Sequence, residues 1–66
     1  MTLEQIYKRA KLTNPFYQKS TFADFIQDFG NCGEEFFDSL EEYNKWIMKK
    51  ENYIYWYGFY KKYYKQ

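Results

Sequence analysis

The stretch TFADFIQDFG, residues 21–30, carries the clearest structural signal in the sequence. Steps of about 100° per residue gather its large apolar residues on one face. These residues are Phe22, Phe25, Ile26 and Phe29. Ser20 or Thr21 can cap the start, and Gly30 can end the segment by adopting the left-handed conformation. The stretch therefore predicts an amphipathic helix.

A helix is also predicted ahead of this stretch. Its apolar stripe consists of Leu3, Ile6, Tyr7 and Ala10. Thr2 and Gln5 have the spacing of a capping box, which favours a helix start. Asn14 precedes Pro15, and a residue in that position is pushed out of the helical region. We therefore expect the first helix to end there.

Beyond Gly30, we expect a short turn through residues 34–37 and then a third helix that starts at Asp38 or Ser39. Ser39 and Glu42 have capping-box spacing. The expected apolar stripe is Leu40, Tyr43 and Ile47. An alternative start lies near Cys32, because Phe36 and Phe37 fit the same stripe.

Residues 53–64 form the most aromatic segment, and their composition alone also suits a strand. Helical periodicity fits better, because six rings fall within about 120° of arc. They are Tyr53, Trp56, Tyr57, Tyr60, Tyr63 and Tyr64. The centre of this stripe lies about 140° around the helix axis from the centre of the stripe of the third predicted helix, so one straight helix cannot bury both stripes. We therefore predict a break near Glu51 and Asn52, where Asn52 tolerates an unusual backbone angle.

Together these patterns predict an all-α fold: one compact domain, residues 1–66, with three to four short helices. The core should be rich in aromatic rings, because the chain has nine Tyr, seven Phe and two Trp but no valine.

Composition excludes several kinds of site. Histidine is absent and Cys32 is the only cysteine, so neither a disulfide nor a His/Cys zinc site can form within the chain. A nucleophilic cysteine usually needs a histidine base. The acidic segment lacks the alternation of a calcium loop. We expect no enzyme, no metal and no cofactor. Without a leader-like or membrane-spanning segment, a cytoplasmic location is expected.

Charge is distributed unevenly along the chain. Residues 20–44 contain seven acidic residues and no basic one, whereas both flanking segments are basic. This asymmetry predicts an acidic docking surface for a basic partner. The expected acidic contacts are Asp24, Asp28, Glu34, Glu35, Asp38, Glu41 and Glu42. Three rings lie off the predicted core stripes and either widen the core or act as exposed anchors. These are Trp46, Tyr55 and Phe59.

The function expected from these features is a small protein-interaction module. A bias toward residues with AT-rich codons suggests a phage or mobile-element accessory protein that modulates a host protein. A host nucleic-acid-binding protein is a suitable target, since carboxylates can stand where phosphates bind. The alternative is a nucleic-acid-binding protein that uses Lys49, Lys50, Lys61, Lys62 and Lys65. A third hypothesis is a homo-oligomeric assembly protein.

Overall fold

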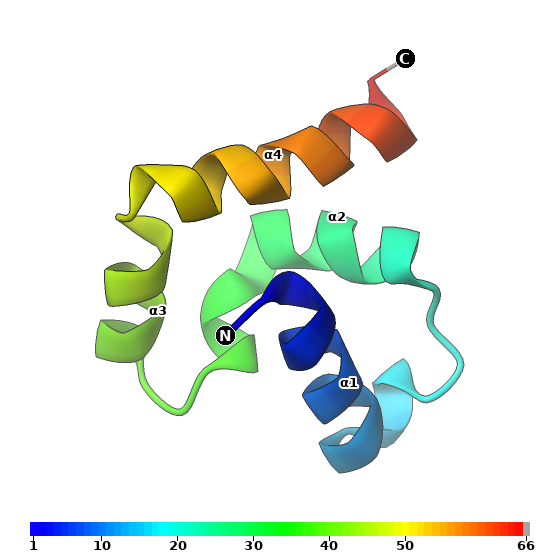
Figure 1. Ribbon diagram of the computed structural model, residues 1–66. Coiled ribbons are helices and arrows are strands. Elements are labelled where there is room, and N and C mark those ends of the chain that lie inside the picture. Colours follow the sequence, from blue (N-terminus) through cyan, green and yellow to red (C-terminus); the bar gives the residue numbers. More distant parts are fainter. Residues whose placement is uncertain (66) are drawn as a thin grey trace.

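The computed structural model describes residues 1–65, which form an all-α fold with no strand among them (Figure 1). The helices are α1 (Leu3–Thr13), α2 (Phe22–Cys32), α3 (Leu40–Ile47) and α4 (Lys50–Tyr64). Two short 3₁₀ turns, η1 (Pro15–Tyr17) and η2 (Gly33–Phe36), follow α1 and α2. The predicted fold class is therefore confirmed.

Helix α1 begins and ends where the sequence predicts. The Thr2 side chain accepts a hydrogen bond from the Gln5 amide, and the Gln5 side chain accepts one from the Thr2 amide. Asn14 closes the helix in an extended conformation. Its side chain then accepts a hydrogen bond from the Phe16 amide and so caps η1, in which Pro15 needs no amide donor.

Helix α2 starts at the predicted Thr21 cap but runs past Gly30 to Cys32. The prediction of a left-handed conformation at Gly30 is wrong, because no residue among 1–65 has a positive φ. The glycine serves a different purpose. A Cβ atom at this position would lie 2.6 Å from Cζ2 of Trp56 in α4. Gly30 therefore leaves room for the Trp56 ring of α4 to pack against α2.

Helix α3 starts after Ser39, as the capping-box spacing indicates. The Ser39 hydroxyl accepts a hydrogen bond from the Glu42 amide over 3.1 Å. The alternative start near Cys32 is wrong, because Phe37 and Ser39 are both extended and separate η2 from α3.

The break before α4 comes slightly earlier than predicted. Lys49 is extended, whereas Asn52 lies inside the first turn of the helix. The Asn52 side chain holds the corner by donating a hydrogen bond from Nδ2 to the Trp46 carbonyl over 2.9 Å. Asn52 therefore stabilises the break through its side chain instead of its backbone conformation.

The core lies between α1, α2, η2 and α3. Its buried apolar residues are Leu3, Ile6, Ala10, Tyr17, Phe25, Ile26, Phe29, Phe36 and Trp46. Rings meet largely edge to face, as for Phe25 and Phe36 with centroids 5.0 Å apart. Helix α4 contributes no buried residue and lies antiparallel across α2 as an outer layer (Figure 1).

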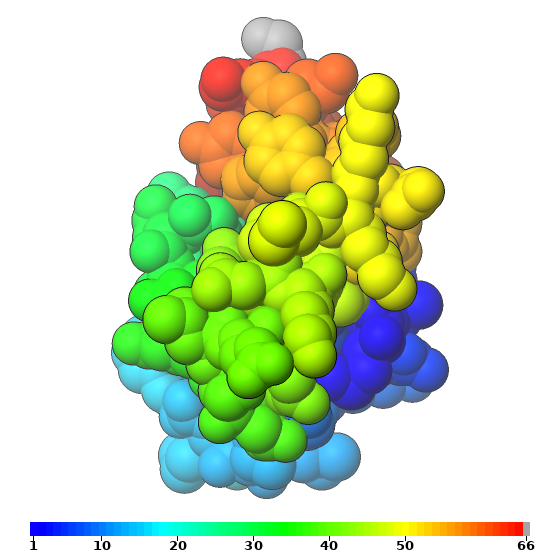
Figure 2. Space-filling view, turned by 90° about the vertical axis from the view of Figure 1, so that its left-hand side faces the viewer, coloured from blue at the N-terminus to red at the C-terminus, as the bar shows by residue number. Residues whose placement is uncertain are grey.

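Trp46 belongs to this core, although its position in the sequence lies off the predicted stripe. Its indole Nε1 donates to the Met1 carbonyl over 2.8 Å, and its ring packs edge-on against Phe29. Leu40, which was expected to be buried, is exposed. Figure 2 shows α3 between the N-terminal residues and the end of α2. Contact with these two segments sets the inward face of α3.

Candidate interaction surfaces

Three acidic residues gather around the junction of α2 and η2. Asp28, Glu34 and Glu35 all raise the pKa of the Cys32 thiol, after burial, which is the largest cause. The Cys32 thiol donates to the Asp28 carbonyl over 3.3 Å. Burial and then the Asp28 charge raise the pKa of Tyr17 to about 12. These shifts keep the thiol protonated, which is the opposite of what a nucleophilic cysteine requires.

An open pocket of about 390 Å³ lies next to these residues, between α1 and η2. The half-buried Phe37 supplies apolar surface, and Glu35 and Asp38 line the same pocket. Arg9 also lines it and donates from a guanidinium nitrogen to the Phe36 carbonyl over 2.6 Å, which ties η2 to α1. We call Asp28, Glu34, Glu35 and Asp38 the acidic face.

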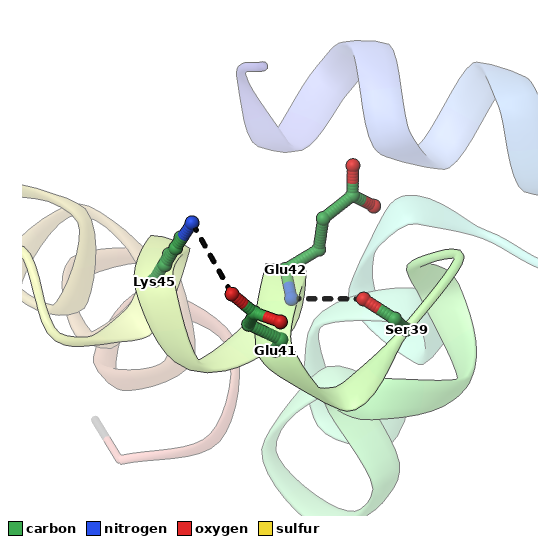
Figure 3. Close-up of polar contacts among 4 residues, drawn as sticks. All are labelled: Ser39, Glu41, Glu42 and Lys45. Atoms are coloured by element: carbon green, nitrogen blue, oxygen red, sulfur yellow. Dashed lines mark hydrogen bonds and ion pairs between the residues drawn. The ribbon is translucent and has the colours of Figure 1, made fainter.

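The remaining predicted acidic residues have local roles in helix starts. An Asp24 carboxylate oxygen accepts a hydrogen bond from the Thr21 amide. Glu42 accepts one from the Asp38 amide, and Glu41 forms an ion pair with Lys45 at 3.4 Å. Figure 3 shows the Glu41 and Glu42 side chains pointing in different directions. Helix capping thus gives Asp24 and Glu42 a local role, and the ion pair with Lys45 gives Glu41 one.

The three predicted anchor rings do not form one exposed patch. Trp46 lies in the core. Phe59 is half-buried and packs edge-on against Phe22, with centroids 5.1 Å apart. Tyr55 is 38% exposed and donates its hydroxyl proton to Glu4, which lowers the pKa of that carboxyl. These rings therefore extend the packing between helices, the first of the two interpretations.

The predicted lysines fall into two groups on α4. Lys49 and Lys50 stand at its start, and the others stand near its end, about 17 Å away at 1.5 Å per residue. The Lys61 and Lys65 ammonium groups lie over the Tyr57 ring, 5.3 and 5.7 Å from its centroid. Lys62 lies over the ring of Tyr63 at 5.8 Å.

A feature that the sequence assigned to the core lies instead at the surface. Tyr53, Tyr57, Tyr60 and Tyr64 stack along one side of α4, and we call them the tyrosine ladder. Tyr53 is 47% exposed and Tyr64 is 38% exposed, whereas Tyr57 and Tyr60 are half-buried and Tyr60 packs against the core. The signal for this exposure is that every member carries a hydroxyl group, whereas the buried positions of α2 are Phe and Ile.

Comparisons with protein-family models, with curated proteins and with solved structures found no match to this chain. Within residues 1–65, no group of three or more acidic or cysteine side chains is arranged to hold a metal ion. No helix in this part of the chain has the length and apolar character needed to cross a membrane. The geometry of the described residues is therefore the basis for the functional assignment.

Proposed function

We propose that this chain is a small non-enzymatic protein-interaction module whose acidic face binds a basic surface of a partner protein. One observation supports this most: Glu35 and Asp38 line a pocket, and Glu35 acts together with Asp28 and Glu34 on the nearby Cys32 thiol. Among residues 1–65, the ion pair that the structure shows joins Glu41 and Lys45, on α3. The charge of the acidic face is thus left to attract an external cation.

The pocket suits a lysine or arginine side chain of such a partner. The half-buried Phe37 ring offers apolar surface for the alkyl stem, while Glu35 and Asp38 can accept hydrogen bonds from the cationic end. The Arg9 guanidinium lines the same pocket, but it donates to the Phe36 carbonyl. A volume of about 390 Å³ lies within the usual range for ligand pockets. One inserted basic side chain would act as the anchor, and the surrounding carboxylates would orient the partner.

The partner class that fits best is a nucleic-acid-binding protein of a host cell. Such proteins present lysines and arginines in grooves that hold phosphates, and a row of carboxylates can occupy that place. The AT-rich coding bias of the sequence agrees with a phage or mobile-element accessory protein that would inhibit or regulate this target.

Affinity capture from a host lysate tests the proposal when it is combined with charge reversal and nuclease treatment. The variant Glu34→Lys/Glu35→Lys should lose the captured protein, because it replaces two carboxylates of the acidic face with ammonium groups. Glu41→Lys/Glu51→Lys makes the same change in net charge on α3 and α4 and should retain it. Circular dichroism checks that both variants keep their helicity.

Two outcomes would contradict the proposal. Capture that survives reversal of Glu34 and Glu35 would show that another surface binds the partner. Capture that disappears on nuclease treatment would favour the nucleic-acid alternative instead.

The structure gives the nucleic-acid alternative one supporting observation, because the rings of α4 are not buried and can stack on bases. The position of the lysines argues against it. Lys49 and Lys50 lie about 17 Å along α4 from Lys61, so the five lysines do not form one continuous basic surface. This alternative predicts an affinity for single-stranded DNA or RNA that falls steeply with salt concentration.

A further inference from the structure

The tyrosine ladder is a row of four rings along α4, in which Tyr53 and Tyr64 are exposed and Tyr57 and Tyr60 are half-buried. Ring centroids are 6.0 Å apart for Tyr53 and Tyr57, 6.3 Å for Tyr57 and Tyr60, and 5.4 Å for Tyr60 and Tyr64. The ladder follows α4 for about 17 Å. Trp56 stacks behind it and donates its indole proton to the Ile26 carbonyl over 2.9 Å, which fixes the ladder on α2.

The two long edges of the ladder carry opposite charges. Lys61 and Lys65 lie over Tyr57 and form the basic edge. On the other side, the Tyr64 hydroxyl donates to the carbonyl of Ala23, the residue before Asp24. Asp24 and Asp28 stand four residues apart on α2 and so share one face of it, at this end of the ladder. After burial, their charges also raise the pKa of Tyr64. They form the acidic edge.

We propose that the tyrosine ladder is covered by the ladder of a second copy of this chain, in a two-fold symmetric dimer with parallel α4 helices. The arrangement follows from the charged edges. A two-fold axis that runs along the helices places the basic edge of each protomer against the acidic edge of its partner. An axis across the helices would make them antiparallel and would bring like charges together.

The chemistry of the surface agrees with this occupant. Tyrosines are enriched at interface cores, and Ile54, 56% exposed, adds apolar surface on α4. A chain of 66 residues also gains stability by association, because its own core is small.

Sedimentation equilibrium of the full chain at low and high salt tests the dimer. We expect the dimer mass at tens of micromolar, with weaker association at high salt. Lys61→Glu/Lys65→Glu should weaken dimerisation at least tenfold, because both edges then carry negative charge. Asp24→Asn/Asp28→Lys should do the same with positive charge, while the new carboxamide at position 24 still offers an oxygen acceptor to the Thr21 amide.

An equimolar mixture of the two variants is the decisive sample. Each variant then supplies the edge that the other lacks, so the mixture should recover the dimer mass. A mixture that stays monomeric would overturn the parallel arrangement. Wild-type protein that remains monomeric at millimolar concentration would overturn the dimer altogether and would assign the ladder to a different molecule. Glu34→Lys/Glu35→Lys should dimerise normally, because Asp28 is the one residue that the acidic face shares with the acidic edge.

Discussion

Helices α2 and α4 lie side by side and both are rich in aromatic residues, yet only α2 is part of the core. Phe25, Ile26 and Phe29 of α2 are almost fully buried, whereas no residue of α4 is buried. The difference shows that aromatic content does not decide burial. A helix needs neighbours on more than one side, and α4 has α2 beneath it and an open outer side (Figure 1).

The two helices are also held by different interactions. Rings of α2 are packed by α1, η2 and α3. In contrast, α4 is attached by side-chain hydrogen bonds to backbone carbonyls, from Trp56 to Ile26 and from Tyr64 to Ala23. Hydrophobic burial should therefore dominate the stability of the first region, while polar contacts and edge packing position the second.

The largest expected effect is the difference in the free energy of unfolding between a substitution in the core and one in the outer layer, α4. Phe29→Ala should lower the free energy of unfolding by about 3–5 kcal/mol, which leaves a chain of this size largely unfolded. Tyr53→Ala, on the exposed side of α4, should cost about 1 kcal/mol or less. Urea denaturation followed by circular dichroism measures both. Equal losses in the two variants would show that α4 is as integral to folding as α2.

A second experiment compares wild type with a variant of the buried tyrosine at high pH. Burial and the neighbouring Asp28 charge raise the pKa of Tyr17 to about 12. The pKa of Tyr17 is therefore higher in the folded protein than in the unfolded chain. The contribution of protonated Tyr17 to the free energy of unfolding is complete below pH 10 and is lost as the pH rises from about 10 to 12. Tyr17→Phe should remove an alkaline loss on the order of 1–3 kcal/mol.

Free energies of unfolding at pH 9 and pH 11.5 provide the measurement for Tyr17. An unchanged alkaline slope in the variant would mean that Tyr17 ionises in the folded protein as readily as in the unfolded chain.

Substitutions at two glycines test how closely α4 packs against α2. Gly30→Ala should cost about 1 kcal/mol net, because the new methyl group meets the indole ring of Trp56, which its hydrogen bond holds in place. Gly58→Ala is the matched control: a Cβ there meets nothing within 4 Å, so helix propensity should raise stability by about 0.5–1 kcal/mol.

The indole proton resonances of the two tryptophans report where the Gly30 change acts. Gly30→Ala should move the Trp56 resonance and leave that of Trp46 in place. A stabilising effect similar to that of Gly58→Ala would show that α4 does not approach α2 this closely.

The smallest effect concerns the hydrogen bond between Tyr55 and Glu4, which joins α4 to α1. The bond lowers the pKa of Glu4 from its ordinary value of 4.5, so its contribution is present above that value and is lost as the pH falls through the lowered pKa. Tyr55→Phe should cost less than about 1 kcal/mol at neutral pH. Carbon-detected NMR titration of Glu4 should show a higher pKa in the variant; no change would mean the bond is absent in solution.

Local patterns in the sequence were sufficient for most helix boundaries. The Thr2, Thr21 and Ser39 caps and the Asn14–Pro15 stop act within a few residues, so neighbouring residues alone could predict them. The Gly30 prediction was wrong because a glycine that ends a helix and one that admits a neighbouring ring look the same in sequence. The acidic residues could be named as candidates from the sequence, but their division between the acidic face and the helix caps depends on η2.

The sequence by itself determined that the chain is helical, where its caps lie and that its core is built from rings, because these properties follow from periodicity and composition. The tertiary structure decided which rings are buried. Trp46 is buried because its indole nitrogen donates to the Met1 carbonyl and its ring packs against Phe29. The tyrosine ladder stays at the surface because α4 has a neighbour on one side only, and burial depends on segments that are distant in the sequence.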